Sequence, residues 1–165
     1  MPKKAFFSFH YAPDNWRVSQ IRNIGAIEGN PTVTDNDWET VKRGGDLGIQ
    51  NWIDNQISGK SCGIVMIGSN TKGRKWINYE IAKLWNEGKG VLGIYIHNLK
   101  DSSGNQSLKG QNPFDEITLN NGATRISSVV KTYDPPYSTS TYVYDHIKEN
   151  IENWINESLA IRAKY

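Results

Sequence analysis

The sequence predicts an α/β fold, a flavodoxin-like three-layer sandwich in which about five parallel strands form one sheet with helices on both faces. Two apolar runs carry this prediction, residues 63–67 (GIVMI) and 91–97 (VLGIYIH). Both are rich in β-branched residues and lack polar alternation, which is typical of strands covered on both faces. Segments with helical apolar spacing alternate with such runs, and this order favours a parallel sheet with right-handed crossovers.

The first half of the chain is expected to contain two strands and two helices before the run at 63–67. An aromatic strand over residues 5–9 (AFFSF) is followed by a loop at 10–14, where Asp14 or Asn15 could cap a helix over 16–27. Residues 32–34 form a short strand at best, and 35–46 are expected as a polar segment and a flexible loop. A helix over 47–57 comes next.

The second half is expected to begin with a helix that has Ile77, Ile81 and Leu84 on one side, followed by the strand at 91–97. Residues 100–112 are rich in Ser, Gly, Asn and Gln and read as a surface loop. A last strand over 126–133 and a long helix from residue 142 complete the pattern. Without internal repeats or a boundary signal, residues 1–165 are expected to form a single domain.

The composition excludes several classes of protein. The net charge is +2, from 19 basic and 17 acidic side chains, which gives no electrostatic case for binding nucleic acid or an anionic membrane. No apolar run is long enough for a signal peptide or a membrane span. The lone Cys62 is expected in the core and indicates a reducing, cytoplasmic setting.

Motifs for several α/β chemistries are absent from the sequence. It contains no P-loop, no G-x-G-x-x-G after the first strand and no G-x-S-x-G elbow. His10, His97 and His146 are far apart and have no Cys partners, so no metal site is expected. His10 could line a site because it ends the first strand, whereas His146 is expected to be solvated.

Glu80 is a candidate residue of a ligand site. It lies about 60° round the helix from Ile77, at the edge of the buried face, and follows a predicted parallel strand. Open α/β sheets bind ligands at the carboxyl ends of their strands. The alternative is a solvated glutamate that merely favours the helix. Six tryptophans and eight tyrosines also suit a site that stacks on flat rings.

Two stretches resemble the bacterial TIR-like (Toll/interleukin-receptor-like) family, namely residues 4–14 (KAFFSFHYAPD) and 61–81 (SCGIVMIGSNTKGRKWINYEI). The second resembles the family pattern G-S-x-T…W-[IV]-x-[YW]-E-[IL], here Gly68, Ser69, Thr71, Trp76, Ile77, Tyr79, Glu80 and Ile81. Residues 112–115 (NPFD) resemble the TIR-like proteins of Thoeris anti-phage defence. The resemblance runs from Lys4 to about Phe114, and the last third matches only by its final helix.

This resemblance implies a flavodoxin-like fold and an enzyme that cleaves NAD between nicotinamide and ribose. NAD would be the substrate, with no further cofactor, and the ADP-ribose would be hydrolysed, cyclised or transferred. In Thoeris-type systems the cyclic ADP-ribose product is a signal that activates a separate effector. The family's catalytic role carries over to Glu80, and its pocket-lining role to Phe9, His10, Tyr11 and Trp38.

The chemistry agrees with the resemblance. Departure of nicotinamide leaves an oxocarbenium-like ribose, which one carboxylate can stabilise, and the cationic leaving group needs no strong acid. Aromatic side chains such as Trp38 and Trp76 could stack on the ligand, although Trp76 could equally pack the start of its helix. Ser69 and Asn70 could bind the ligand or simply cap that helix.

Two other functions remain open at this stage. A TIR-like scaffold would act by self-association without turnover. A nucleoside deoxyribosyltransferase would use a similar fold and a catalytic glutamate on nucleosides. Sites in the TIR-like family are also often completed only on self-association.

Overall fold

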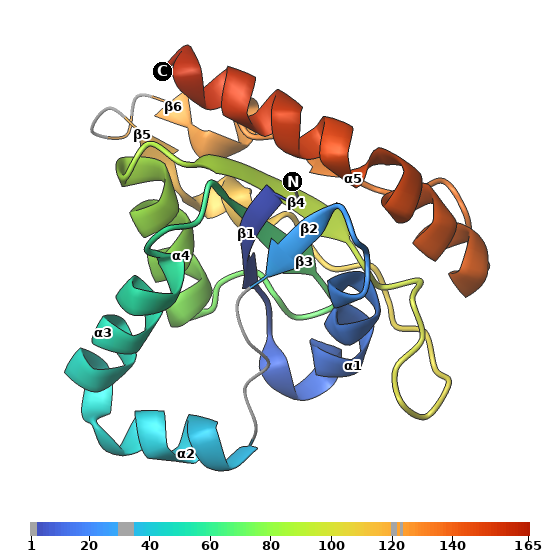
Figure 1. Ribbon diagram of the computed structural model, residues 1–165, viewed down its shortest axis with the longest axis horizontal. Coiled ribbons are helices and arrows are strands. Elements are labelled where there is room, and N and C mark those ends of the chain that lie inside the picture. Colours follow the sequence, from blue (N-terminus) through green and yellow to red (C-terminus); the bar gives the residue numbers. More distant parts are fainter. Residues whose placement is uncertain (1–2, 30–34, 120–121, 123) are drawn as a thin grey trace.

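A five-stranded parallel sheet forms the centre of the molecule (Figure 1). The computed structural model describes residues 3–29, 35–119, 122 and 124–165. The strands are β1 (Lys3–Ser8), β2 (Ile27–Gly29), β3 (Cys62–Ile67), β4 (Gly90–Tyr95) and β7 (Thr132–Tyr133). Their spatial order is β2-β1-β3-β4-β7, and every neighbouring pair is parallel. This is the flavodoxin-like order, so the predicted fold class is confirmed.

Helices cover both faces of this sheet, with α1 (Tyr11–Arg22) and α5 (Ser140–Ala163) on one face and α3 (Gly45–Ile57) and α4 (Lys75–Asn86) on the other. A further helix, α2 (Asp35–Arg43), packs against α3 and lies away from the sheet (Figure 1). Buried side chains of α1 and α5 share one apolar cluster with the sheet, and those of α3 and α4 share the other. Two short 3-10 helices, η1 (Pro113–Glu116) and η3 (Ile126–Ser128), and an unpredicted hairpin of β5 (Thr118–Leu119) and β6 (Thr124–Arg125) lie between β4 and β7 in the sequence.

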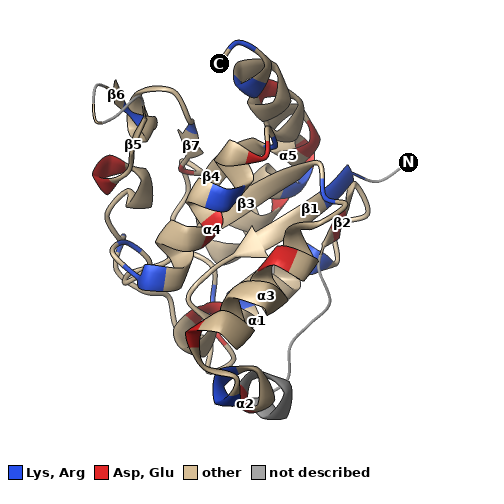
Figure 2. Cartoon of the chain, turned by 90° about the vertical axis from the view of Figure 1, so that its left-hand side faces the viewer, with Lys and Arg blue, Asp and Glu red and all other residues tan. Residues whose placement is uncertain are grey.

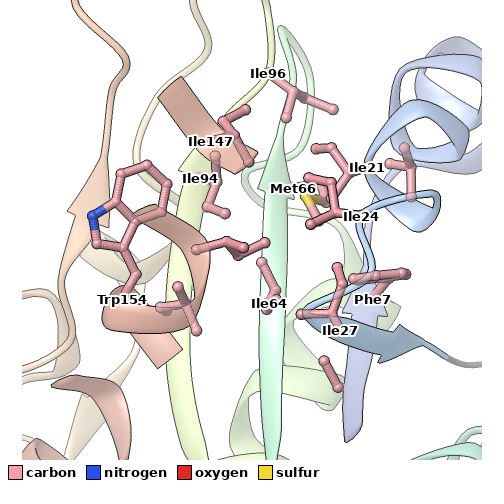
Figure 3. Close-up of a cluster of buried hydrophobic side chains, with 14 of the residues drawn as sticks. Phe7, Ile21, Ile24, Ile27, Ile64, Met66, Ile94, Ile96, Ile147 and Trp154 are labelled. Carbon is pink, nitrogen blue, oxygen red and sulfur yellow. The ribbon is translucent and has the colours of Figure 1, made fainter. Parts of the chain in front are cut away.

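The apolar runs that predicted the strands fill the core. Figure 3 shows Ile64 and Met66 of β3 and Ile94 of β4 between Ile21 of α1 and Ile147 of α5. Both β3 and β4 lack charged residues, which lie mainly on the surrounding helices and loops (Figure 2). None of the described helices has the length and apolar character needed to cross a membrane.

Helix α1 differs from the prediction at both ends. It begins at Tyr11, so the expected loop at residues 10–14 is largely helical, and it ends at Arg22. Asp14 is not a cap but a buried residue of the first turn, paired with Arg17 at 3.0 Å. Ile27 begins β2, where it pairs with Lys3 of β1. The spacing of the isoleucines fitted a longer helix, but the long-range pairing decides the outcome.

Two further segments differ from the prediction, and a third cannot be compared with it. The strand expected at 32–34 lies outside the described residues. Residues 35–43, expected to be polar and irregular, form α2. The strand expected at 126–133 is confined to Thr132–Tyr133, because Ile126 begins a 3-10 turn and points with Val130 into the core.

The position of α4 depends on a glycine in β3. A Cβ at Gly63 would lie 2.2 Å from Cδ1 of Leu84, so a larger residue would force either the buried Leu84 side chain or α4 itself to move. Leu84 lies one turn after Glu80 on the same face of α4. The close packing of β3 and α4 therefore sets how near Glu80 comes to the sheet.

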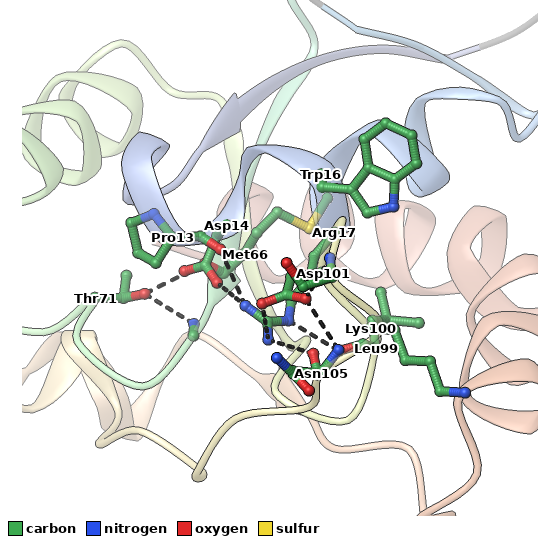
Figure 4. Close-up of polar contacts among 12 residues, drawn as sticks. Pro13, Asp14, Trp16, Arg17, Met66, Thr71, Leu99, Lys100, Asp101 and Asn105 are labelled. Atoms are coloured by element: carbon green, nitrogen blue, oxygen red, sulfur yellow. Dashed lines mark hydrogen bonds and ion pairs between the residues drawn. The ribbon is translucent and has the colours of Figure 1, made fainter.

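The loop at 100–112 is tied to α1 by Arg17, which is itself buried (Figure 4). The guanidinium of Arg17 donates to the carbonyl oxygens of Leu99 at 2.8 Å and Asn105 at 2.9 Å, and also pairs with Asp14. Because these carbonyls lie at both ends of the 99–105 segment, the expected surface loop has a defined position against α1.

Candidate active site

Glu80 lies where the first and third strands of the chain meet. Its side chain is on α4, directly after β3, and only 8% of the residue is exposed. The hydroxyl of Ser8, the last residue of β1, donates a hydrogen bond of 2.9 Å to Oε1 of Glu80. The alternative of a solvated glutamate is therefore wrong. In this strand order the connections from β1 and β3 run to opposite sides of the sheet, and such switch points are where open α/β sheets bind ligands.

Burial changes the acid–base behaviour of Glu80. It raises the pKa of the carboxyl to about 8, because water no longer stabilises the charged form, while the Ser8 hydrogen bond acts in the opposite direction. In the free protein at neutral pH the carboxyl is therefore mostly protonated. A cationic ligand placed against it would favour the ionised form.

A cavity of about 1100 Å³ opens in front of Glu80. Its wall combines the end of β1, the start of α1, and parts of α2, α3 and α4. Aromatic rings make up much of this wall: Phe6, Phe7, Phe9, Tyr11, Trp16, Trp52 and Trp76. The volume and the aromatic lining are suited to a ligand with two flat ring systems.

Positive charge surrounds the same cavity. The cationic side chains are Arg22, Lys42, Arg74 and Lys75. Lys42 and Lys75 form ion pairs with Glu39 and Asp46. Arg74 donates from Nε to the carbonyl of Asn70 at 2.9 Å, and within the described part of the chain it forms no ion pair with a carboxylate. The rim is therefore suited to an anionic group such as a phosphate.

His10 also lines the cavity, next to this rim. Burial and, to a lesser extent, the charge of Arg74 lower the pKa of its imidazole, so the ring is neutral at pH 7. Its Nδ1 is buried and has no hydrogen-bond partner among the described residues. A neutral ring with a free nitrogen can exchange hydrogen bonds with a ligand without adding charge.

Five of the residues singled out from the sequence meet at this cavity: Phe9, His10, Tyr11, Trp76 and Glu80. Ser69 is half-buried in the turn after β3 and is not part of the described lining. Trp38 lies within α2, but its side chain is outside the described part of the structure. The ligand-binding or catalytic roles of all seven residues stay predictions.

The expectation that Ser69 or Asn70 caps the helix is wrong. Helix α4 begins at Lys75, and its N-cap is Arg74, without a side-chain hydrogen bond. Thr71 instead organises the turn, because its buried Oγ1 accepts a 2.8 Å hydrogen bond from the backbone N–H of Gly68.

Other residues of the recognised motifs have structural contacts. The hydroxyl of Tyr79 donates to Oδ1 of Asp54 at 2.6 Å and so joins α4 to α3. The side chain of Asn112 accepts from the N–H of Phe114 at 2.9 Å, and the ring of Phe114 is fully buried. The NPFD segment is thus a capped 3-10 turn anchored in the core.

Sequence reasoning missed Ser8, Trp16, Trp52 and Arg74. Ser8 was visible as one small polar residue inside an aromatic strand, and Arg74 as the first of two basic residues at the start of a helix. Neither feature of the sequence indicates which residue the side chain of Ser8 or Arg74 contacts in the folded protein. Trp16 and Trp52 fitted ordinary helical patterns.

The described residues contain no group of three or more His, Cys, Asp or Glu side chains that could hold a metal ion. Cys62 is fully buried, which raises the pKa of its thiol to about 12 and confirms its place in the core. His146 is not solvated as expected, but half-buried with its ring near those of Tyr137 and Trp154.

The fold and the cavity define an α/β protein with a buried carboxyl and an aromatic, cationic pocket at the switch point of its sheet. Residues 6–101 match the family described as "Thoeris protein ThsB, TIR-like domain". This match covers more than half of the chain, includes Ser8 and Glu80, and shows that the chain belongs to this family.

One curated relative extends the comparison. The chain is 37% identical over 122 residues to a protein of Bacillus cereus (strain MSX-D12) named "Putative cyclic ADP-D-ribose synthase ThsB1". The aligned part covers 71% of this chain and 64% of that protein, so it spans slightly less than two thirds of the relative's length.

Proposed function

We propose that this protein cleaves NAD between nicotinamide and ribose and converts the ADP-ribose to a cyclic nucleotide signal in anti-phage defence. The observation that carries this proposal is the buried carboxyl of Glu80, hydrogen-bonded to Ser8 beside an aromatic and cationic cavity. The name of the Bacillus cereus relative supports cyclisation as the second step.

Glu80 would act on the ribose next to the nicotinamide. When the bond between C1′ and the nicotinamide nitrogen breaks, its electron pair goes to the ring and neutralises the pyridinium charge. Positive charge then develops on the ribose, and an adjacent carboxylate stabilises it and accepts a hydrogen bond from a ribose hydroxyl. The substrate's own cation favours the ionised form of Glu80 that this step requires.

The rest of the cavity would hold the two ends of the dinucleotide. Aromatic side chains such as Trp76 and Tyr11 can stack on the nicotinamide and adenine rings, and Arg74 can bind the pyrophosphate. Folding the adenine back onto C1′ would let a ring nitrogen attack in place of water and give a cyclic product. Attack by water would give ADP-ribose.

The remaining parts of the proposal concern the setting of the reaction. We propose that residues 1–165 act as a single TIR-like domain in the cytoplasm, that copies of the chain self-associate, and that a separate effector protein senses the product. The match of residues 6–101 to a TIR-like domain supports the first of these statements, and the others rest on the resemblance to the TIR-like family.

The proposal is tested by incubating the protein with NAD and separating the products by chromatography and mass spectrometry. We expect free nicotinamide and a product with the mass of NAD minus nicotinamide. A product heavier by one water would indicate a hydrolase instead of a cyclase. Glu80→Ala is expected to release no nicotinamide although it remains folded.

Two outcomes would point to the other functions. Base exchange on deoxynucleosides without loss of NAD would identify a deoxyribosyltransferase. No nicotinamide release at high protein concentration, even with phage-infected lysate added, would indicate a scaffold.

A further inference from the structure

The hydroxyl that contacts Glu80 comes from a rigid part of the fold. Ser8 is fully buried at the end of β1, next to Val65 of β3 in the parallel register. It lies 72 positions before Glu80 in the chain, so the contact depends on the packing of α4 against the sheet. Among the described residues, Ser8 is the hydrogen-bond partner of the Glu80 side chain.

We propose that Ser8 is a positioning residue, whose hydroxyl holds Oε1 of Glu80 so that Oε2 is presented to the ribose of the substrate. This inference rests on the proposed function and assigns a role that neither the family match nor the relative's name contains. Ser8 acts through Glu80 and is not part of the described lining of the cavity.

A glutamate carboxyl needs such a partner because its terminal torsion is soft. The last dihedral angle of Glu is broad and roughly two-fold, so an unanchored carboxyl samples many orientations. A reacting group has to be held within a fraction of an ångström of its productive geometry, and an external hydrogen bond can do this.

A hydroxyl suits this task because it can both donate and accept. It accepts from the protonated carboxyl or donates to either form, so contact is kept when Glu80 loses its proton on substrate binding. Donation is strongest to the charged form, which also assists ionisation. An alanine at position 8 would leave the carboxyl both free to rotate and harder to ionise.

Three variants separate this role from a general packing effect. Ser8→Ala removes the hydroxyl, and Ser8→Thr keeps it. Ser158→Ala is the matched control, because Ser158 is also buried but its hydroxyl donates to the carbonyl of Ile155 within α5.

Each variant is examined in two ways: by the pH profile of kcat/KM for nicotinamide release, and by ¹³C NMR titration of the Glu80 carboxyl. For Ser8→Ala we expect the acid limb of the profile to move up by about one pH unit, which lowers the rate at pH 7 about tenfold. The pKa of the Glu80 carboxyl, measured by NMR, should rise in the same variant. In Ser8→Thr the pH profile and this pKa should return to their wild-type values, and in Ser158→Ala neither should change.

The proposal is overturned if Ser8→Ala leaves the carboxyl titration unchanged, or lowers the rate equally at every pH without moving the titration. If the wild type itself releases no nicotinamide, the proposed function fails. The NMR titration then tests the role of Ser8 independently of activity. A Glu80 titration curve that is shifted in Ser8→Ala supports the proposed contact, and an unshifted curve overturns the proposal.

Discussion

Glu80 combines two properties that oppose each other, since it is buried away from water and yet its proposed chemistry needs a negative charge. The structure offers one partial compensation, the Ser8 hydrogen bond, which opposes the effect of burial. It does not bring the pKa of the free protein's carboxyl below about 8. In the proposed reaction, the pyridinium of NAD would supply the missing positive charge, so that Glu80 would ionise mainly when the substrate is bound.

The raised pKa of Glu80 predicts a pH-dependent loss of stability. Its value is about 8 in the folded protein against an ordinary 4.5, so as pH rises through this window the unfolded chain loses a proton that the folded protein retains. Stability present below pH 4.5 is therefore lost by about pH 8. Glu80→Gln has no carboxyl to titrate and lacks this loss. Its free energy of unfolding should therefore rise by about 2–4 kcal/mol relative to that of the wild type as the pH increases from 4.5 to 8.5.

Urea denaturation across this pH range measures the effect. Glu87→Gln is the control, because Glu87 is an exposed residue at the end of the same helix and should show no comparable change relative to wild type. A constant difference between wild type and Glu80→Gln at all pH values would mean that the carboxyl ionises normally in the folded protein.

Arg74 provides a second prediction for a single residue. If it binds the pyrophosphate, Arg74→Ala should raise KM for NAD about tenfold with little change in kcat, because that contact is the same in the ground and transition states. Added salt should raise KM more in the wild type than in the variant. Steady-state kinetics with Lys148→Ala, which removes an exposed cation of α5, give the comparison. Equal KM values for Arg74→Ala and wild type would remove this contact from the account.

Among the elements, the loop after β4 depends most clearly on one side chain. Arg17→Ala would leave Asp14 as a buried carboxylate without its partner and the carbonyls of Leu99 and Asn105 without their donor. Removing one partner of a buried ion pair costs about 3–5 kcal/mol. We expect a loss of this size in chemical denaturation, with faster proteolysis of the loop.

Gln20→Ala is the matched control for that loop. Gln20 also donates from α1 to the loop, at the carbonyl of Lys100, but this bond is exposed and should contribute less than about 1 kcal/mol. If Arg17→Ala and Gln20→Ala lowered the free energy of unfolding by similar amounts, burial of the Arg17 contacts would not increase their contribution to stability.

The elements that the sequence predicted well are those with a strong local pattern. The runs of β3 and β4 and the apolar faces of α3, α4 and α5 can be recognised without knowing their partners. The strand β2 has three residues and exists through its pairing with β1, and β7 has two. Such short elements carry no periodicity, and the isoleucines around them fit helix, strand or turn equally well.

At the scale of the whole molecule, the site is formed by segments that are far apart in the sequence. The resemblance led to Glu80 and to Phe9, His10 and Tyr11 because each lies in a recognisable motif next to a strand end. The pairing of Ser8 with Glu80 follows from the neighbouring positions of β1 and β3, and from the packing of α4 that Gly63 allows. A single sequence indicates the residue types, but the partner of each depends on tertiary packing.

The most direct test of this account is the rate of nicotinamide release from NAD by wild type, Glu80→Gln and Glu87→Gln at pH 8.5. Each variant removes one carboxylate, but Glu80 lies within α4 and faces the cavity, whereas Glu87 is the exposed C-cap of that helix. We predict that Glu80→Gln loses activity about 10²–10³-fold or more, whereas Glu87→Gln keeps the wild-type rate. Nicotinamide release by Glu80→Gln at the wild-type rate would contradict the central role of the buried carboxyl.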